Sequence, residues 1–441
     1  LRSCRTLSKG SLACAAELIA GDDPSTRPRT THCRRQLTLG IYRWHRPIGF
    51  YRRQGSVSSL AGQDGSVYSA VALGSRPPTH GGNLSQEAAR MGLTPGQLLD
   101  ASASLVPFRP PSLLLRALER GIRGGALRDY PDRSQNELRG AIAAWHGIDA
   151  DAVLPGNGAA ELFTWAARDA AACGVSGLLE PGFADYRRAL ACWGGAVQGL
   201  PMDLSWSGQG AEPWPVLMDQ HAHAQVLWIT NPHNPTGQLW SRASLEPLLG
   251  RHRLVICDEA FLPLVPEGER QTLIPLVAEY PNLVVIRSLT KLFAVAGLRL
   301  GYAIAAPERL QQWSQWRDPW PVNGLALAAG TAVMADQQGL ARWQQRVQYW
   351  VRDEGAWLQH QLRQLPGLNP RPSSANYLLV EGQASLLALR EQVAQRGVLL
   401  RDCRSFEGLG ERWLRIGLQD RRGNRRILQA LRGALRHQPL A

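Results

Sequence analysis

The sequence has almost no lysine, since only Lys9 and Lys291 stand against 47 arginines in 441 residues. Arginine therefore supplies nearly every surface cation, and a lysine kept within the largely apolar residues 289–300 indicates chemistry that a guanidinium cannot perform. A guanidinium stays protonated, whereas a partly desolvated amine can lose its proton and form an imine with a carbonyl compound. Lys291 is therefore a candidate catalytic residue. The alternative is a lysine that extends from an apolar segment into solvent.

Long apolar runs and paired cysteines are absent as well. No run reaches the ~18 apolar residues that a membrane-spanning helix needs, and the seven scattered cysteines include no C-x-x-C pair. This pattern is typical of reduced thiols and argues against a disulfide framework or a zinc site. With 44% hydrophobic residues, the chain can bury a large core. We therefore expect a soluble, cytoplasmic protein of two domains that binds no metal.

The net charge of +13 is unevenly distributed along the chain. Residues 1–76 hold twelve Lys/Arg and four acidic residues, a net of +8, which leaves +5 for the other 365 residues. A strongly basic chain can indicate a nucleic-acid partner, but +5 is modest for a body of this size. We therefore expect no nucleic-acid partner, and we expect some of these arginines to face small anionic ligands.

Residues 1–76 show no sustained helical or strand period and are left unassigned. We interpret this segment as disordered or as a non-native extension translated from upstream sequence, with the true start near residues 67–73. A basic arm that binds nucleic acid is the functional alternative.

Residues 153–306 alternate short apolar strands with helices, which predicts a mostly parallel sheet. The predicted strands are 153–155, 178–180, 226–230, 254–257, 283–287 and 301–305. All but the last are followed at once by a polar or Gly/Pro-rich group, and ligands of open α/β sheets bind beyond the carboxyl ends of the strands. We therefore expect one crevice. A long helix over 339–365 then precedes a smaller α+β unit with strands at 375–380, 398–401 and 413–417.

The residues after these strands match the needs of a pyridoxal 5'-phosphate site. Lys291 offers the amine, and Asp258 can stay ionised beside the protonated ring nitrogen. Asn234 offers an amide to the ring oxygen. Phe183 can stack on the ring face.

The cofactor phosphate has its own candidates. Gly158 and Ala159 open a helix, whose free N–H groups suit a phosphate, and Ser288 and Arg299 can complete the pocket. Residues 156–161 also approach the G-x-G-x-x-G pattern of a dinucleotide site. That alternative lacks the third glycine and leaves the other strand-end groups without a role.

The ordered set of motifs resembles fold-type I pyridoxal-phosphate enzymes of the class I/II aminotransferase superfamily, over about residues 80–435. The motifs are Gly156-Asn157-Gly158, Asn231-Pro232-His233-Asn234-Pro235-Thr236-Gly237, Asp258-Glu259-Ala260-Phe261, Ser288-Leu289-Thr290-Lys291 and Arg299-Leu300-Gly301-Tyr302. The resemblance implies a large cofactor-binding domain over 111–330 with a mostly parallel central sheet. It also implies an N-terminal arm over 77–110 that forms part of the small domain, and a small α+β domain over 331–441.

Within the superfamily the chain is most similar to the threonine-phosphate decarboxylases of cobalamin biosynthesis. The motifs that carry this likeness are His80-Gly81-Gly82-Asn83, Pro181-Gly182-Phe183-Ala184, Tyr186-Arg187-Arg188-Ala189-Leu190, Asp258-Glu259-Ala260-Phe261, Arg287-Ser288-Leu289-Thr290-Lys291 and Pro319-Trp320-Pro321-Val322-Asn323. The resemblance implies decarboxylation of L-threonine O-3-phosphate to (R)-1-amino-2-propanol O-2-phosphate. The alternative is a histidinol-phosphate aminotransferase or a related transaminase. Such enzymes usually carry tyrosine where this chain has Phe261, which favours the decarboxylase.

The resemblance also implies contacts to a small phosphorylated amino acid. The implied substrate-binding residues are His80, Gly81, Ser104, Asn234, Arg401 and Arg415. Arg415 matches the arginine that binds the substrate carboxylate, and Arg401 matches a ligand of the substrate phosphate. Ser104 stands where the decarboxylases usually have asparagine, and its hydroxyl has a shorter reach. Tyr130 resembles the tyrosine that reaches the cofactor phosphate of the neighbouring subunit, which implies a homodimer.

Overall fold

The computed structural model describes residues 81–208, 210–216 and 223–437, all within the unit Ala72–Ala441. The segment 1–76 and the predicted substrate ligand His80 lie outside the described residues. The interpretation of 1–76 as a disordered or non-native extension therefore stays a prediction.

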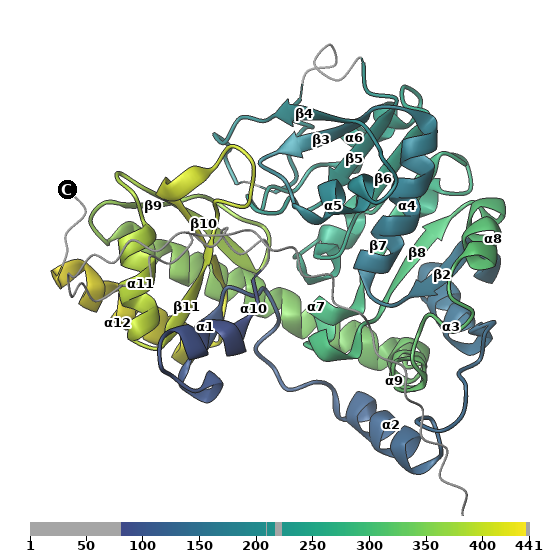
Figure 1. Ribbon diagram of the computed structural model, residues 1–441, viewed down its shortest axis with the longest axis horizontal. Coiled ribbons are helices and arrows are strands. Elements are labelled where there is room, and N and C mark those ends of the chain that lie inside the picture. The colour runs from purple at the N-terminus through teal and green to yellow at the C-terminus, as the bar shows by residue number, and fades with distance from the viewer. Residues whose placement is uncertain (1–80, 209, 217–222, 438–441) are drawn as a thin grey trace, which may run out of the picture. The chain divides into compact units, whose positions relative to one another are not determined.

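A seven-stranded sheet forms the larger part of the fold (Figure 1). Its strands are β2 (Val153–Gly156), β3 (Ser176–Glu180), β4 (Val197–Pro201), β5 (Val226–Thr230), β6 (Leu254–Asp258), β7 (Leu283–Ser288) and β8 (Gly301–Ala305), in the order β2-β8-β7-β6-β5-β3-β4. Neighbouring strands are parallel except where β8 pairs with β2 and β7. The predicted α/β fold with a mostly parallel central sheet is confirmed. The edge strand β4 escaped prediction because only Leu200 of its residues is buried, so it has no apolar run.

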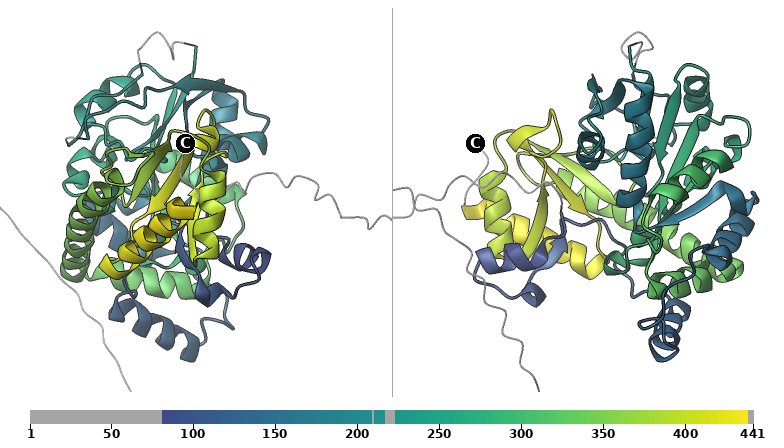
Figure 2. Two further views of the ribbon diagram at one scale, coloured as in Figure 1. Left: turned by 90° about the vertical axis from the view of Figure 1, so that its left-hand side faces the viewer. Right: turned by 45° about the vertical axis from the view of Figure 1, so that its right-hand side comes forward.

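Helices cover both faces of this sheet because its central strands are apolar on both sides. In β5, Val226 and Trp228 pack on one face, whereas Leu227 and Ile229 pack on the other. The first face carries α4 (Ala159–Cys173), α5 (Asp185–Ala191) and α8 (Pro307–Trp316). The second carries α3 (Asn136–His146), α6 (Arg242–Leu249) and α9 (Gly324–Ala335), and α2 (Ser112–Arg123) packs on α9 (Figure 2).

A five-stranded sheet forms the smaller part. It runs in the order β1 (Leu99–Ala101), β11 (Val398–Asp402), β12 (Trp413–Gly417), β10 (Tyr377–Gly382) and β9 (Leu368–Pro370). Its associated helices are α1 (Leu84–Arg90), α11 (Leu387–Gln395) and α12 (Arg421–His437). Strand β1 pairs in parallel with β11, so residues near 100 complete a sheet made otherwise of residues beyond 367. The domain bounds inferred from the sequence stay a prediction.

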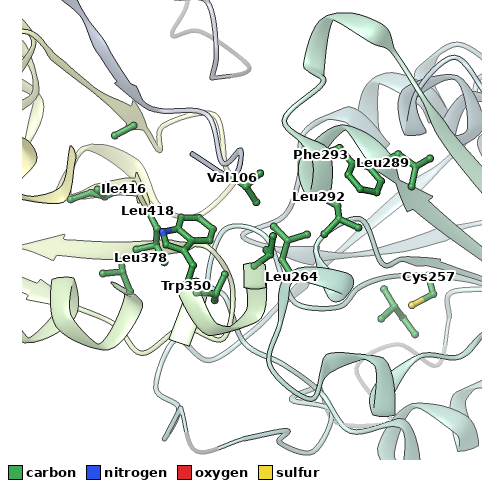
Figure 3. Close-up of a cluster of buried hydrophobic side chains, with 14 of the residues drawn as sticks. Val106, Cys257, Leu264, Leu289, Leu292, Phe293, Trp350, Leu378, Ile416 and Leu418 are labelled. Carbon is green, nitrogen blue, oxygen red and sulfur yellow. The ribbon is translucent and has the colours of Figure 1, made fainter. Parts of the chain in front are cut away.

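The long helix α10 (Gln337–Arg363) joins the cores of the two sheets. Figure 3 shows Trp350 of α10 between Leu378 and Ile416 of the smaller sheet and Leu292 of α7 (Leu289–Phe293), the short helix that follows β7. All four side chains are at least 90% buried. Because α7 carries the candidate lysine, this shared core fixes the lysine's helix relative to the smaller sheet.

Short 3-10 helices complete the described secondary structure. They are Pro95–Gln97, Ala150–Ala152, Leu262–Leu264, Gly268–Gln271, Ile274–Leu276, Ala296–Leu298 and Gly410–Arg412. Among the described residues, no helix is long and apolar enough to cross a membrane.

Candidate active site

A cavity of about 290 Å³ lies where the strand ends of the larger sheet face the smaller sheet. The predicted site residues that line it are Gly81, Ser104, Ala159, Phe183, Asn234, Asp258, Ser288, Lys291, Arg299, Arg401 and Arg415. The carboxyl ends of β2, β3, β5, β6 and β7 therefore meet at one crevice, as the strand-end pattern predicts.

Lys291 lies in the first turn of α7, immediately after the buried strand β7. Its Nζ is 5.6 Å from the centre of the Phe261 ring. Burial lowers the pKa of Lys291 to about 8, and the positive charges of Arg415 and Arg299 add to this effect, while Asp258 opposes it. Near neutral pH, Lys291 therefore supplies the neutral, nucleophilic amine far more readily than an ordinary lysine.

Asp258 ends β6 and is 5% exposed. The hydroxyl of Tyr186 donates to its Oδ2 at 2.5 Å, and the backbone N–H of Ala260 donates to its Oδ1 at 2.9 Å. Burial raises the pKa of Asp258 to about 6, against the lowering effect of these two hydrogen bonds and of Lys291. Above pH 6 the side chain is a carboxylate that can pair with a cation in the cavity.

A cradle suited to an oxyanion lies at the start of α4. Gly158 caps the helix at φ +76°, and a Cβ there would lie 2.6 Å from Nη2 of Arg299. A Cβ at Gly301 would lie 2.9 Å from the backbone nitrogen of Ala159. The glycines therefore let the guanidinium and the helix N-terminus approach the same point, beside Ser288. This donor set fits the phosphate of the predicted cofactor.

Two arginines of the smaller sheet complete the cavity. Arg401 of β11 and Arg415 of β12 are direct partners across the strands, and both are buried. Arg415 donates to Oδ1 of Asn234 and lies 4.8 Å from the centre of the Tyr377 ring. Burial lowers the pKa of Arg401 to about 10, with Arg415 as the next cause. Two guanidinium groups this close favour an anionic ligand between them.

Several residues in the cavity or directly behind it were not predicted as site residues. The centre of the Phe406 ring lies 5.3 Å from the guanidinium carbon of Arg401 and 5.7 Å from that of Arg415. Ser102 accepts a hydrogen bond from Arg415 at its carbonyl oxygen, at 3.3 Å. Tyr186, which contacts Asp258 from behind and does not line the cavity, appeared in the sequence only as part of a family motif. No local pattern could have revealed these three, because their positions result from contacts between distant elements.

Two further predicted site residues, Ser104 and Tyr130, differ in whether they line the cavity. Ser104 lines the cavity, and its buried Oγ has no hydrogen-bond partner within the described structure, as expected of a group that awaits a ligand. Tyr130 does not line the cavity of its own chain; it is 78% exposed and stacks on Trp320 with ring centres 4.3 Å apart. Its contact with a neighbouring subunit stays a prediction.

The described residues enclose a second, larger cavity of about 550 Å³ beside Arg139 and Arg317. Arg139 pairs with Asp151 at 2.7 Å, and Arg317 donates to the carbonyl oxygen of Pro155 at 2.7 Å. No lysine lines this cavity. The cavity that contains Lys291 is therefore the candidate active site.

Comparison with known families identifies the class of protein. The model of the family "Aminotransferase class I and II" matches residues 90–431. The chain belongs to this family, and its cofactor is pyridoxal 5'-phosphate.

Individual relatives point to two activities. The chain is 34% identical over 373 residues to threonine-phosphate decarboxylase of Salmonella typhimurium, covering 81% of this chain and 96% of that protein. It is also 34% identical over 313 residues to histidinol-phosphate aminotransferase of Symbiobacterium thermophilum, covering 69% of this chain and 82% of that protein. Among solved structures, histidinol-phosphate aminotransferase of Sinorhizobium meliloti in complex with pyridoxal-5'-phosphate has a TM-score of 0.70 at 20% identity, covering 84% and 99% of the two chains. This last similarity concerns the fold alone.

Proposed function

We propose that the chain catalyses the pyridoxal-phosphate-dependent decarboxylation of L-threonine O-3-phosphate to (R)-1-amino-2-propanol O-2-phosphate, a step of cobalamin biosynthesis. The longer of the two 34% matches, which spans 96% of a threonine-phosphate decarboxylase, supports this proposal. Phe261 supports it as well, because it leaves the cavity without the tyrosine hydroxyl expected of the transaminases. Phe261 packs edge-on against Tyr377, with ring centres 5.2 Å apart.

The charge of the cavity is the observation that carries the proposal. The charged residues lining the cavity are Asp185, Asp258, Lys291, Arg299, Arg401 and Arg415. Asp185 is already paired with Arg188, at 2.5 Å. Four cations therefore face one available carboxylate. Such an excess suits a cofactor and a substrate that both carry a phosphate, together with the substrate carboxylate.

The roles proposed at the cofactor ring follow from the neighbours of each side chain. When bound, pyridoxal phosphate supplies an aldehyde carbon and an electron-withdrawing ring. Lys291 holds that aldehyde through its amine, and Asp258 holds a proton at the ring nitrogen by its negative charge. Asn234 orients the ring oxygen, while Phe183 covers one ring face.

The phosphate of the cofactor is held at a different end of the cavity. Its proposed ligands are Gly158 and Ala159 through backbone N–H groups, Ser288 through its hydroxyl and Arg299 through its guanidinium. Tyr130 of a second subunit is the proposed additional ligand in a homodimer. Together these groups would fix the phosphate end of the cofactor, away from Lys291.

Substrate orientation decides which bond at Cα breaks. Arg415 binds the substrate carboxylate, and Arg401 binds the substrate phosphate together with Ser104, Gly81 and His80. By fixing two anionic groups, the two arginines would set which Cα bond is presented to the cofactor, which is a positioning effect. Lys291, with its pKa near 8, can then deliver a proton to Cα.

Histidinol-phosphate aminotransferase is the second candidate, favoured by the other relative at 34% identity. The two reactions use the same cavity and differ in the bond that the anion contacts place perpendicular to the ring. A transaminase presents the Cα–H bond and needs a 2-oxo acid as amino acceptor.

Release of CO2 from L-threonine O-3-phosphate by the reconstituted enzyme tests the proposal. We expect stoichiometric CO2 and an amino-propanol phosphate product, and no turnover by Lys291→Ala. Amino transfer from histidinol phosphate to 2-oxoglutarate without CO2 release would instead identify the aminotransferase. Arg128→Met, which changes an arginine 86% exposed at its side chain, is a matched control and should leave the rate unchanged.

The proposed homodimer has its own test. Lys291→Ala and Tyr130→Phe subunits are unfolded together, refolded as a mixture and assayed. If Tyr130 serves the partner's site, mixed dimers contain one site with both native residues, and activity exceeds that of either variant alone. Activity equal to the mean of the two separate variants would contradict a shared site.

A further inference from the structure

The hydroxyl of Tyr186 lies directly behind the acid of the candidate site. Tyr186 is the second residue of α5 and is 4% exposed. Its hydroxyl is 2.5 Å from Oδ2 of Asp258 and 2.9 Å from Oγ1 of Thr230. Its ring packs edge-on against Phe163 and Phe183, with ring centres 5.1 and 5.5 Å away. The ring therefore has no room to turn the hydroxyl away from the carboxylate.

The direction of these hydrogen bonds follows from proton counting. Tyr186 has a single hydroxyl proton, and an ionised Asp258 can only accept. Tyr186 therefore donates to Asp258, and the hydroxyl of Thr230 donates to the oxygen of Tyr186. The backbone N–H of Ala260 donates to the other carboxylate oxygen at 2.9 Å. Both oxygens of Asp258 are thus held, and with them the plane of the carboxylate.

We propose that Tyr186 is a positioning residue that keeps the carboxylate of Asp258 ionised and aimed at the ring nitrogen of the cofactor. The inference rests on the proposed pairing of Asp258 with that nitrogen. Tyr186 itself does not line the cavity, so it acts through Asp258. Thr230 extends the same chain of hydroxyl groups by one residue.

The surroundings of Asp258 support this role. The titratable groups that face it are Tyr186 on α5, Lys291 on α7, Cys257 on β6, Glu259 directly after β6 and Tyr377 on β10. Burial raises the pKa of Asp258, and the hydrogen bond from Tyr186 is the largest of the effects that lower it. The bond from Ala260 and the charge of Lys291 contribute less, and the charge of Glu259 acts in the opposite direction.

The test measures cofactor affinity instead of turnover. The full chain is freed of cofactor and titrated with pyridoxal phosphate, and separately with the carbocyclic analogue that has C–H in place of the ring nitrogen. Binding is followed by tryptophan fluorescence between pH 5 and pH 8.5. Because the two ligands share their aldehyde and phosphate, the ratio of their affinities isolates the contact between Asp258 and the ring nitrogen.

We expect the wild type to prefer pyridoxal phosphate at pH 8 and to lose this preference as Asp258 is protonated. In Tyr186→Phe the midpoint of that loss moves upward by about one pH unit, since a hydrogen bond to a charged group changes an equilibrium by about tenfold or more. Tyr302→Phe is the matched control. It also removes a buried tyrosine hydroxyl, bonded to His146 at 2.8 Å, and should leave the midpoint unchanged.

An unchanged midpoint in a folded Tyr186→Phe protein would overturn the inference and leave Tyr186 a packing residue. If that variant does not fold, Thr230→Val decides: a smaller shift in the same direction supports the chain of hydroxyl groups, and no shift overturns it. Failure of the underlying proposal looks different. In that case the wild type itself would bind both ligands equally at every pH.

Discussion

Two adjacent carboxylates, Asp258 and Glu259, occupy opposite environments in this protein. Asp258 lines the cavity and has two hydrogen-bond donors, Tyr186 and Ala260. Glu259 is 0% exposed and faces away from the cavity into a closed network. In that network, Oε2 of Glu259 lies 2.7 Å from Nη2 of Arg287.

In the network around Glu259, a single guanidinium contacts both the carboxylate of Glu259 and that of Glu269. Arg287 also donates to both oxygens of Glu269, each at 2.9 Å, so one guanidinium joins two carboxylates. Thr272 donates to Oε2 of Glu259 at 2.7 Å, and the backbone N–H of Leu273 donates to Oε1 at 2.8 Å. Removing one partner from such a network leaves a buried charge uncompensated, so these side chains depend on one another, whereas Asp258 retains negative charge that a ligand can use.

The contrast between Asp258 and Glu259 predicts that Arg287→Met has the largest effect, a loss of folding stability. Removing the guanidinium leaves two carboxylates close together without a cation, which costs about 4 kcal/mol of folding free energy. Urea denaturation measures this loss. Arg352→Met is the control, since its ion pair with Asp353 is about 60% exposed on both sides and is worth about 0.5 kcal/mol at most. Equal stability of the two variants would contradict the structural role given to the network.

Asp258→Asn is expected to impair turnover and spare the fold. The amide has the shape of the carboxylate but lacks the charge that holds a proton at the ring nitrogen. The turnover rate should fall by a factor of about 10²–10³. Steady-state kinetics at saturating cofactor measure the change. A rate within a factor of three of the wild type would remove Asp258 from its proposed role.

The same variant should stabilise the cofactor-free protein above pH 6. The pKa of Asp258 rises from an ordinary 3.8 to about 6 on folding, so the carboxylate destabilises the folded state increasingly between these values. The shift corresponds to about 3 kcal/mol, and the weakened bond from Tyr186 reduces the expected gain of Asp258→Asn to about 2 kcal/mol. Thermal denaturation at pH 8 and pH 4 measures it. The gain should be absent at pH 4, where the wild-type acid is neutral.

Thr272→Val should have the smallest effect. The hydroxyl of Thr272 donates to Glu259 and accepts from Nη2 of Arg287 at 2.9 Å, while the ion pair persists without it. We expect a loss of about 1 kcal/mol and an unchanged turnover rate, because Thr272 does not line the cavity. A large loss of turnover with intact stability would mean that the network also serves the cavity.

Much of the fold could be predicted from the sequence. Apolar strands that are each followed by a polar group, such as residues 254–257 before Asp258, could be predicted from local periodicity and from the chemistry of strand ends. The short strand β1 could not be found in this way, because three residues carry no period and its pairing partner is Val398–Asp402, about 300 positions later. The edge strand β4, most of whose residues are only half-buried, was missed for a related reason.

The residues of the candidate site likewise include some that the sequence revealed and some that it did not. Lys291 stood out by composition, and Asp258 by its place after a strand. The sequence revealed neither the burial nor the hydrogen-bond partners that distinguish Asp258 from its neighbour Glu259. Tyr186 was likewise hidden, because its hydroxyl reaches Asp258 across 72 positions.

The sequence by itself determined which residue types follow each strand, and therefore that an amine, an acid and an anion-binding helix start would meet at one edge of a parallel sheet. Only the tertiary structure decided the opposite environments of the two neighbouring acids, with Asp258 in the cavity and Glu259 in a closed network. It also brought Arg401 and Arg415 into register above that edge. The physical reason is that burial and hydrogen-bond partners come from elements far apart in the chain, and these partners decide whether a charge stabilises the fold or is left available for a ligand.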